Sequence, residues 1–158
     1  MKKKKADGLK PVRSVAPLFS AALLVLAFDQ ITKAFAIQYL RPGASVAVIL
    51  NFFHLTFVEN SGIAFGLFER HPGWLTVVIT ISVAVLFVYA WFFSKKSTAE
   101  QLAYGFILGG AFGNWVDRLR FQNVIDFLDF RIWPVFNLAD TFITIGVVLF
   151  VWFALKGK

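Results

Sequence analysis

Residues 74–93 read WLTVVITISVAVLFVYAWFF and contain no charged side chain. A helix needs about 20 apolar residues to cross a hydrocarbon core of about 30 Å, so this segment is long enough to span a membrane. Residues 17–39, 101–118 and 138–155 are also mainly apolar, although each contains one or two charged side chains. Of all 158 residues, 58% are hydrophobic and 16% charged, whereas soluble domains are nearer one quarter charged. The sequence therefore predicts one integral membrane domain over 1–158, built as an all-α bundle of four transmembrane helices.

The basic residues are distributed unevenly between the two sides of these spans. Ten of the 16 lie on one side, six of them in the tail 1–16, and five lie in the other two loops. Lysine and arginine favour the cytoplasmic side, so we expect both termini in the cytoplasm and interpret the tail as an anchor rather than a nucleic-acid-binding segment. Ala34-Phe35-Ala36 would fit a signal-peptide cleavage site, but Asp29 and Lys33 interrupt the apolar stretch before it, which favours an uncleaved span.

The two loops on the opposite side differ in composition. Within 41–73, residues 46–50 and 52–58 are rich in β-branched and aromatic side chains, and turn-forming residues flank them. This pattern predicts a small extracytoplasmic β-rich element that rests on the membrane surface. We interpret 119–136 as a short aromatic loop in which Trp133-Pro134 imposes extended backbone before the last span.

Polar side chains within the spans gather toward the outer leaflet, and most have a structural explanation. Two charges lie one helical turn apart in the first span and could form an ion pair. An asparagine followed by an acid at the start of the fourth span could be a helix cap. Glycines spaced by four on the third span favour close helix packing. These residues are Asp29 with Lys33, Asn137 with Asp140, and Gly105 with Gly109 and Gly113; Asn114, Asp117 and Arg118 end the third span.

Asp126 has no comparable structural explanation. A carboxylate near a membrane is expensive, and Asp126 lies only 14 positions before Asp140. The chain has no cysteine, no G-x-S-x-G motif and no H-E-x-x-H motif, and His54 and His71 lack the spacing of metal ligands. Two adjacent carboxylates can share a proton and hydrolyse a bond without a metal or cofactor, one as base and one as acid. Asp140, near a helix N-terminus, is the better candidate for the ionised base.

Two other functions remain compatible with intramembrane carboxylates. A proton-coupled transporter would also use them, although it would place them near the bilayer midplane rather than at the outer boundary. An assembly factor without activity would use the polar residues only to fix helix packing. Loss of activity in a folded aspartate variant separates the enzyme from both.

Five blocks of the sequence together resemble the lipoprotein signal peptidase family, also called signal peptidase II. They occur in the family's order, and with the four spans they cover about 17–155. The blocks are Asp29-Gln30-x-x-Lys33, Glu59-Asn60-Ser61-Gly62-Ile63-Ala64-Phe65, Gly109-Gly110-Ala111-Phe112-Gly113-Asn114-Trp115-Val116-Asp117-Arg118, Val124-Ile125-Asp126-Phe127 and Phe136-Asn137-Leu138-Ala139-Asp140.

The resemblance implies an aspartyl endopeptidase of the bacterial inner membrane, with its site toward the outer leaflet. It would remove signal peptides from prolipoproteins, cutting before a cysteine that carries diacylglyceryl. Asp126 and Asp140 would be catalytic. Five residues would contact substrate or globomycin-type inhibitors: Asn60, Gly62, Asn114, Arg118 and Asn137. Asp29, Lys33 and Asp117 would be structural supports. The expected partners are lipidated prolipoproteins and membrane lipids, and we expect a monomer with no metal and no nucleic acid.

Overall fold

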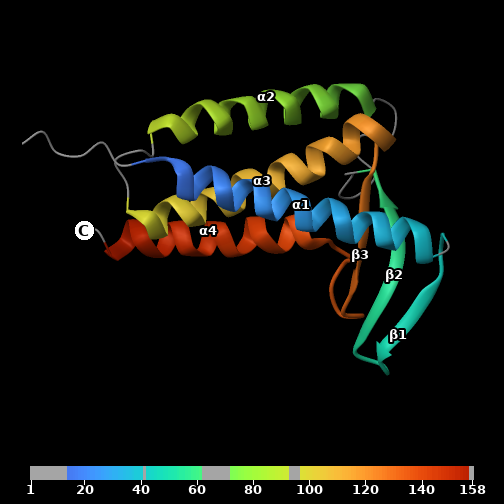
Figure 1. The fold of residues 1–158 in the computed structure, drawn as a ribbon. Coiled ribbons are helices and arrows are strands. Elements are labelled where there is room, and N and C mark those ends of the chain that lie inside the picture. The colour runs from blue at the N-terminus through green and yellow to red at the C-terminus, as the bar shows by residue number, and fades with distance from the viewer. Residues whose placement is uncertain (1–13, 41, 62–71, 93–96, 157–158) are drawn as a thin grey trace, which may run out of the picture.

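The computed structural model describes residues 14–40, 42–61, 72–92 and 97–156. Within them the chain forms four α-helices and three β-strands (Figure 1). In chain order these are α1 (Ala16–Tyr39), β1 (Ser45–Ile49), β2 (Phe53–Asn60), α2 (Pro72–Ala90), α3 (Thr98–Phe121), β3 (Val124–Asp129) and α4 (Leu138–Lys156). The four helices predicted from the sequence are confirmed as helices, with the third longer by three residues at each end. Two of them, α1 and α4, are long and apolar enough to cross a membrane, and Thr76–Ala90 of α2 is apolar but shorter.

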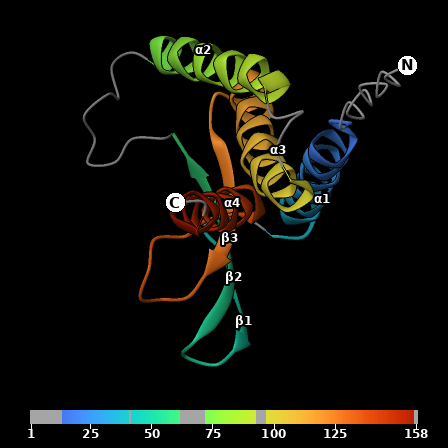
Figure 2. The ribbon, with the colours of Figure 1, turned by 90° about the vertical axis from the view of Figure 1, so that its left-hand side faces the viewer.

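Helix α3 lies at the centre of the bundle and contacts the other three helices. Figure 2 shows α1 and α4 beside α3, with α2 set apart on its other side. Glycines on α3 allow the close approach to α1: a Cβ atom on Gly105 would lie 2.5 Å from the Leu18 carbonyl oxygen, and one on Gly109 would lie 2.5 Å from that of Ala22. The predicted packing role of these glycines is therefore confirmed.

The strands form an antiparallel sheet in the order β1-β2-β3 at one end of the bundle (Figure 1). The predicted β-rich element corresponds to β1 and β2. Strand β3 lies outside it, in the segment that we interpreted as a loop, and Val124-Ile125-Asp126-Phe127-Leu128-Asp129 has the β-branched and aromatic content of a strand. Pairing with β2 buries most of this segment, which the local sequence by itself does not specify.

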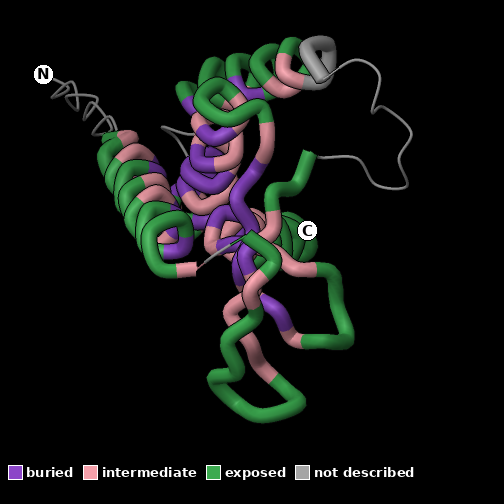
Figure 3. Tube along the Cα trace, turned by 90° about the vertical axis from the view of Figure 1, so that its right-hand side faces the viewer, coloured by how far each residue is buried: buried purple, intermediate pink, exposed green. Residues whose placement is uncertain are grey.

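A small apolar cluster attaches the sheet to the end of α1. It consists of Ala36, Phe57, Ile125 and Phe127. Figure 3 shows the buried positions gathered where the helices meet β3, while the tip of the β1–β2 hairpin is exposed. Strand β3 is thus fixed at the junction between the sheet and the bundle, and its side chains reach the ends of the helices.

Candidate active site

Asp126 and Asp140, the two predicted catalytic residues, come from different elements and join one hydrogen-bond network. Asp126 is on β3 and is 1% exposed. One of its carboxylate oxygens accepts from Asn137 Nδ2 at 2.7 Å and the other from Asn60 Nδ2 at 2.7 Å. Asp140 lies in the first turn of α4 and accepts from Asn114 Nδ2 at 2.7 Å. Each carboxylate is therefore oriented by at least one asparagine amide.

Asn137 and Asn114 connect the two aspartates. Asn137 Oδ1 accepts from the backbone N–H of Asp140 at 2.9 Å, which confirms the predicted helix cap. Asn137 Nδ2 donates to Asn114 Oδ1 at 3.1 Å as well as to Asp126. The side chain of Asn137 thus contacts the carboxylate of Asp126 and the backbone N–H of Asp140. Rotation of either carboxylate would break hydrogen bonds shared with its neighbour.

Burial raises the pKa of the Asp126 carboxyl to about 6, and the charge of Asp140 contributes in the same direction. The amide hydrogen bonds from Asn60 and Asn137 oppose this shift because they stabilise the ionised form. Asp126 therefore holds a proton up to a higher pH than an ordinary aspartate. A carboxyl of this kind suits the role of a proton donor.

This raised pKa predicts a pH dependence of stability. Between pH 4 and pH 6 the folded state keeps the Asp126 proton that the unfolded state has lost, so the free energy of unfolding should fall as pH rises, by about 3 kcal/mol in total. Asp126→Asn removes this contribution. Thermal unfolding of both proteins in detergent should therefore show the wild type losing stability relative to the variant across this range. Parallel curves of stability against pH for the two proteins would contradict the raised pKa of Asp126.

The three predicted supports, Asp29, Lys33 and Asp117, form a buried charge cluster directly behind the aspartates. Lys33 Nζ lies 2.8 Å from Asp29 and 2.7 Å from Asp117, and donates to Asn114 Oδ1 at 3.0 Å. All three charged residues are at most 2% exposed. The predicted ion pair within α1 is confirmed, and Asp117 on α3 is a second partner of the lysine. One cation thus links α1, α3 and, through Asn114, the candidate catalytic network.

The two acids of this cluster also hold the backbone next to each candidate catalytic residue. Asp117 accepts from the backbone N–H of Ile125 at 3.2 Å, and Ile125 precedes Asp126. Asp29 accepts from the backbone N–H of Ala139 at 2.9 Å, and Ala139 precedes Asp140. Lys33 therefore fixes the acceptors for both segments at once. The cluster thus contacts the backbone beside both candidate catalytic residues.

Two further residues complete the polar network. Gln30 Nε2 donates to Asp117 at 2.9 Å and to the Gly113 carbonyl at 3.2 Å, a role that sequence reasoning missed although Gln30 lies beside Asp29 in the same motif. Arg118 donates to the Asn114 carbonyl at 3.1 Å and interacts electrostatically with Asp140 and Asp126. Its buried Nε has no hydrogen-bond partner within the described part of the chain. Arg118 thus brings positive charge to the site.

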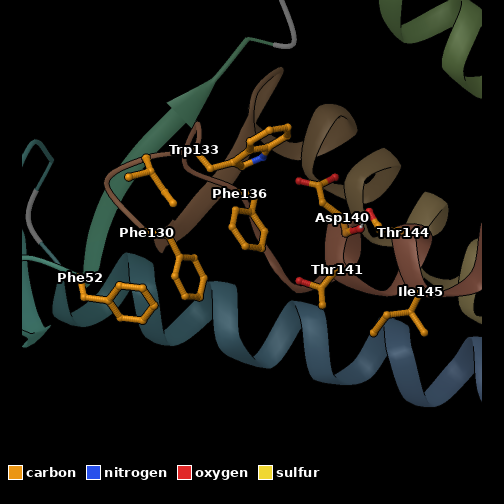
Figure 4. A pocket seen from close by; sticks show the side chains of 9 residues that line it. Phe52, Phe130, Trp133, Phe136, Asp140, Thr141, Thr144 and Ile145 are labelled. Atoms are coloured by element: carbon orange, nitrogen blue, oxygen red, sulfur yellow. Dashed lines mark hydrogen bonds between the residues drawn. The ribbon is translucent and has the colours of Figure 1, made fainter. Parts of the chain in front are cut away.

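An apolar cavity of about 520 Å³ opens beside Asp140. Figure 4 shows Asp140 beside Thr144, with the rings of Phe136, Phe130 and Phe52 lying progressively farther from Asp140. The cavity is lined by Phe52, Phe130, Ile132, Trp133, Phe136, Asp140, Thr141, Thr144 and Ile145. A carboxylate at the edge of an aromatic and aliphatic cavity suits a polar reaction on a largely apolar ligand.

Gly62 is the remaining predicted site residue, and neither of the two histidines is predicted to be a ligand. Gly62 and His71 lie outside the described residues. His54 is on β2, where its ring faces Ser45 rather than the aspartates. No three histidine, cysteine, aspartate or glutamate side chains within the described ranges gather as metal ligands.

Comparison with known structures defines the class of protein. Two solved structures described as bacterial membrane enzymes, at 2.3 and 1.9 Å resolution, each superpose with a TM-score of 0.80. The first is 30% identical in sequence, and the match covers 94% of this chain and 93% of the solved chain. The second is 31% identical, and the match covers 92% of this chain and 97% of the solved chain. The chain therefore has the fold of these membrane enzymes.

The sequence comparisons identify the family. The family described as signal peptidase (SPase) II matches residues 21–156. The lipoprotein signal peptidase of Moorella thermoacetica is 45% identical over 137 residues, covering 86% of this chain and 91% of that protein. That of Halothermothrix orenii is 40% identical over 140 residues, covering 85% and 94%. This chain belongs to the signal peptidase II family, and the predicted membership is confirmed.

Proposed function

We propose that this protein is a membrane aspartyl endopeptidase that removes signal peptides from diacylglyceryl-modified bacterial prolipoproteins. It cuts on the N-terminal side of the lipidated cysteine. The observation that carries the proposal is the pair Asp126 and Asp140, both oriented by asparagine amides, with Asp140 at the edge of an apolar cavity. Membership of the signal peptidase II family supports the substrate.

In the proposed mechanism, Asp140 is the base and Asp126 the acid. Asp140 takes a proton from a water molecule, whose oxygen bonds to the scissile carbonyl carbon while Asp126 protonates the carbonyl oxygen. The C–N bond then breaks as the proton held by Asp140 moves to the leaving amine nitrogen. At the same time a hydroxyl of the tetrahedral intermediate returns its proton to Asp126, which leaves the new carboxylic acid. The raised pKa of Asp126 and the position of Asp140 in the first turn of α4 support this division.

Arg118 and the asparagines have complementary roles in this proposal. The Arg118 guanidinium stabilises negative charge that develops on the carbonyl oxygen, since it interacts electrostatically with both aspartates. Asn60, Asn114 and Asn137 keep the carboxylates oriented and contact the substrate backbone and globomycin-type inhibitors. Asp29, Lys33 and Asp117 maintain the separation of the two catalytic segments through the backbone N–H groups of Ile125 and Ala139.

We further propose that all four helices span the inner membrane, with both termini in the cytoplasm and the sheet at the outer leaflet. The start of α1 and the end of α4 lie at the same end of the bundle, opposite the sheet (Figure 1). A lipid-anchored substrate then presents its cleavage point where the carboxylates lie. The described hydrogen bonds of the two aspartates join residues of a single chain, so the proposed mechanism needs no second copy of the protein.

The test is cleavage by the purified protein of a synthetic prolipoprotein, with and without diacylglyceryl on its cysteine. We expect cleavage of the lipidated peptide alone, before the cysteine, and inhibition by globomycin. Equal cleavage of the unlipidated peptide would contradict the substrate assignment. Proton transport by the protein in liposomes, without cleavage, would favour the transporter.

A further inference from the structure

A second polar network crosses the sheet and takes no part in the chemistry proposed for the dyad, the pair Asp126 and Asp140. Thr56 Oγ1 donates to Asp129 at 2.7 Å and lies 2.8 Å from Ser45 Oγ, which lies 3.0 Å from His54 Nδ1. The register pairs Ser45 with Thr56 and His54 with Asp129, so one face of all three strands contributes. When His54 carries its proton on Nδ1, each group donates to the next and the chain ends on the Asp129 carboxylate.

Asp129 is the last residue of β3 and is 5% exposed. Besides Thr56, its carboxylate accepts from the backbone N–H of Arg131 at 2.8 Å and from Arg131 Nη1 at 3.1 Å. The Thr56 hydroxyl, followed by Arg131, holds the pKa of Asp129 below its usual range. Asp129 is therefore an ionised acceptor at neutral pH, and it joins the fixed strand to the first residues of the loop.

The loop that leaves Asp129 has a conformation that needs such an anchor. Arg131 has φ of +64°, in the left-handed region that costs a non-glycine residue about 1 kcal/mol. Ile132 N donates back to the Phe130 carbonyl at 2.7 Å. The far end is closed by pairing of Leu128 with Phe136. The segment between these two ends has to be held by side chains.

Few side-chain contacts hold residues 130–133, although three of these residues line the cavity beside Asp140. Phe130 contacts the ring of Phe53 at a centroid distance of 4.9 Å and stacks on Phe136 at 5.9 Å. Ile132 and Trp133 also line the cavity but are 87% and 69% exposed, so packing fixes them weakly. Both residues follow directly on the turn at Arg131 that Asp129 holds, so this turn sets where they enter the cavity lining.

We propose that Asp129 is a positioning residue for the substrate-binding wall formed by 130–133, and that Thr56 holds Asp129 in place. The inference rests on the proposed function, because it assigns the cavity to the apolar part of the substrate. Asp129 does not touch the reacting atoms. Its loss loosens the wall and weakens substrate binding while the dyad, held by separate asparagines and by the Lys33 cluster, keeps its geometry.

The test uses Thr56→Val, which removes the hydroxyl without changing the side-chain shape, with Thr56→Ser as the conservative variant. Thr32→Val is the matched control, because the Thr32 hydroxyl bonds to carbonyls of its own helix. Hydrogen exchange of the full-length protein in detergent reports on 130–133, and steady-state cleavage of the lipidated peptide gives kcat and KM. In Thr56→Val we expect exchange of the Arg131 and Ile132 amides to rise about tenfold and KM to rise about tenfold, with kcat within twofold.

Thr56→Ser and Thr32→Val should both behave as the wild type. Unchanged exchange in 130–133 of Thr56→Val would overturn the positioning role, and a fall in kcat at constant KM would overturn the assignment to substrate binding. If the wild-type protein fails to cut the lipidated peptide, the proposed function is wrong. Hydrogen exchange then still tests the positioning of the loop by itself.

Discussion

Replacing either Asp126 or Asp140 by asparagine should lower kcat for a lipidated prolipoprotein by at least about a thousandfold, while the protein stays folded. Asparagine can neither accept nor donate the proton that each step of the proposed hydrolysis requires, and proton transfer by one positioned group contributes about 10² to 10⁴. Because both groups act on the same intermediate, the double variant should be scarcely slower than either single variant.

The hydrogen bonds at the site explain why these variants should fold. At position 140 the asparagine carbonyl can accept from Asn114 as the carboxylate does now. At position 126 the new amide can donate to Asn60 if the Asn60 amide turns over, while Asn137 still finds an acceptor. Removal of a partly desolvated charge should even stabilise position 126 at neutral pH.

The measurement is kcat together with thermal unfolding in detergent. Glu100→Gln is the matched control: it removes a carboxylate from the capping box at the opposite end of α3, where glutamine can still cap, and should cleave normally. Cleavage retained by either aspartate variant would disprove the dyad. Unfolding of both variants would instead favour the assembly factor.

Replacing Lys33 by methionine should lower the free energy of unfolding by about 3–5 kcal/mol. The kcat of the molecules that remain folded should change much less. The change leaves Asp29 and Asp117 buried at 0% and 1% exposure without a compensating charge. Removing one partner of a buried ion pair usually costs about this much, because the other charge loses its solvation without gaining a partner.

A combined variant separates charge from geometry. The triple variant Lys33→Met, Asp29→Asn, Asp117→Asn has no buried charge in the cluster. The asparagine carbonyl at position 29 can still accept from the backbone N–H of Ala139, and the one at position 117 from that of Ile125. Much of the lost stability should return in denaturant unfolding of this triple variant. A Lys33→Met protein that is stable but inactive would contradict the supporting role, and would indicate that the lysine acts on the substrate.

Local patterns were sufficient to predict several parts of the site. Asp29 and Lys33 are one helical turn apart, so their ion pair follows from helix geometry. Asn137 followed by Asp140 predicts a helix cap for the same reason. These predictions depend on residues within four positions of each other, and both local contacts are present although Lys33 also meets Asp117 and Asn137 also meets Asp126.

The contacts between distant residues could not be predicted in this way. Asn60 reaches Asp126 because β2 pairs with β3 in one particular register, and β3 itself forms only because β2 and α1 bury it. Asp117 meets Lys33 because glycines let α3 approach α1 closely. A strand of six residues has too little local preference to specify its own pairing, so its formation depends on neighbours far along the chain.

The sequence by itself determined the four helices found in the described part of the chain, where two of its charges pair, and which residues resemble those of signal peptidase II. Only the tertiary structure decided that Asp126 lies on a strand and that two asparagines join it to Asp140. It also decided that Asp117 and Asp29 hold the backbone beside each aspartate. The physical reason is range: helical turns and caps are fixed by neighbouring residues, whereas a buried carboxylate depends on whichever segments the packed fold brings to it.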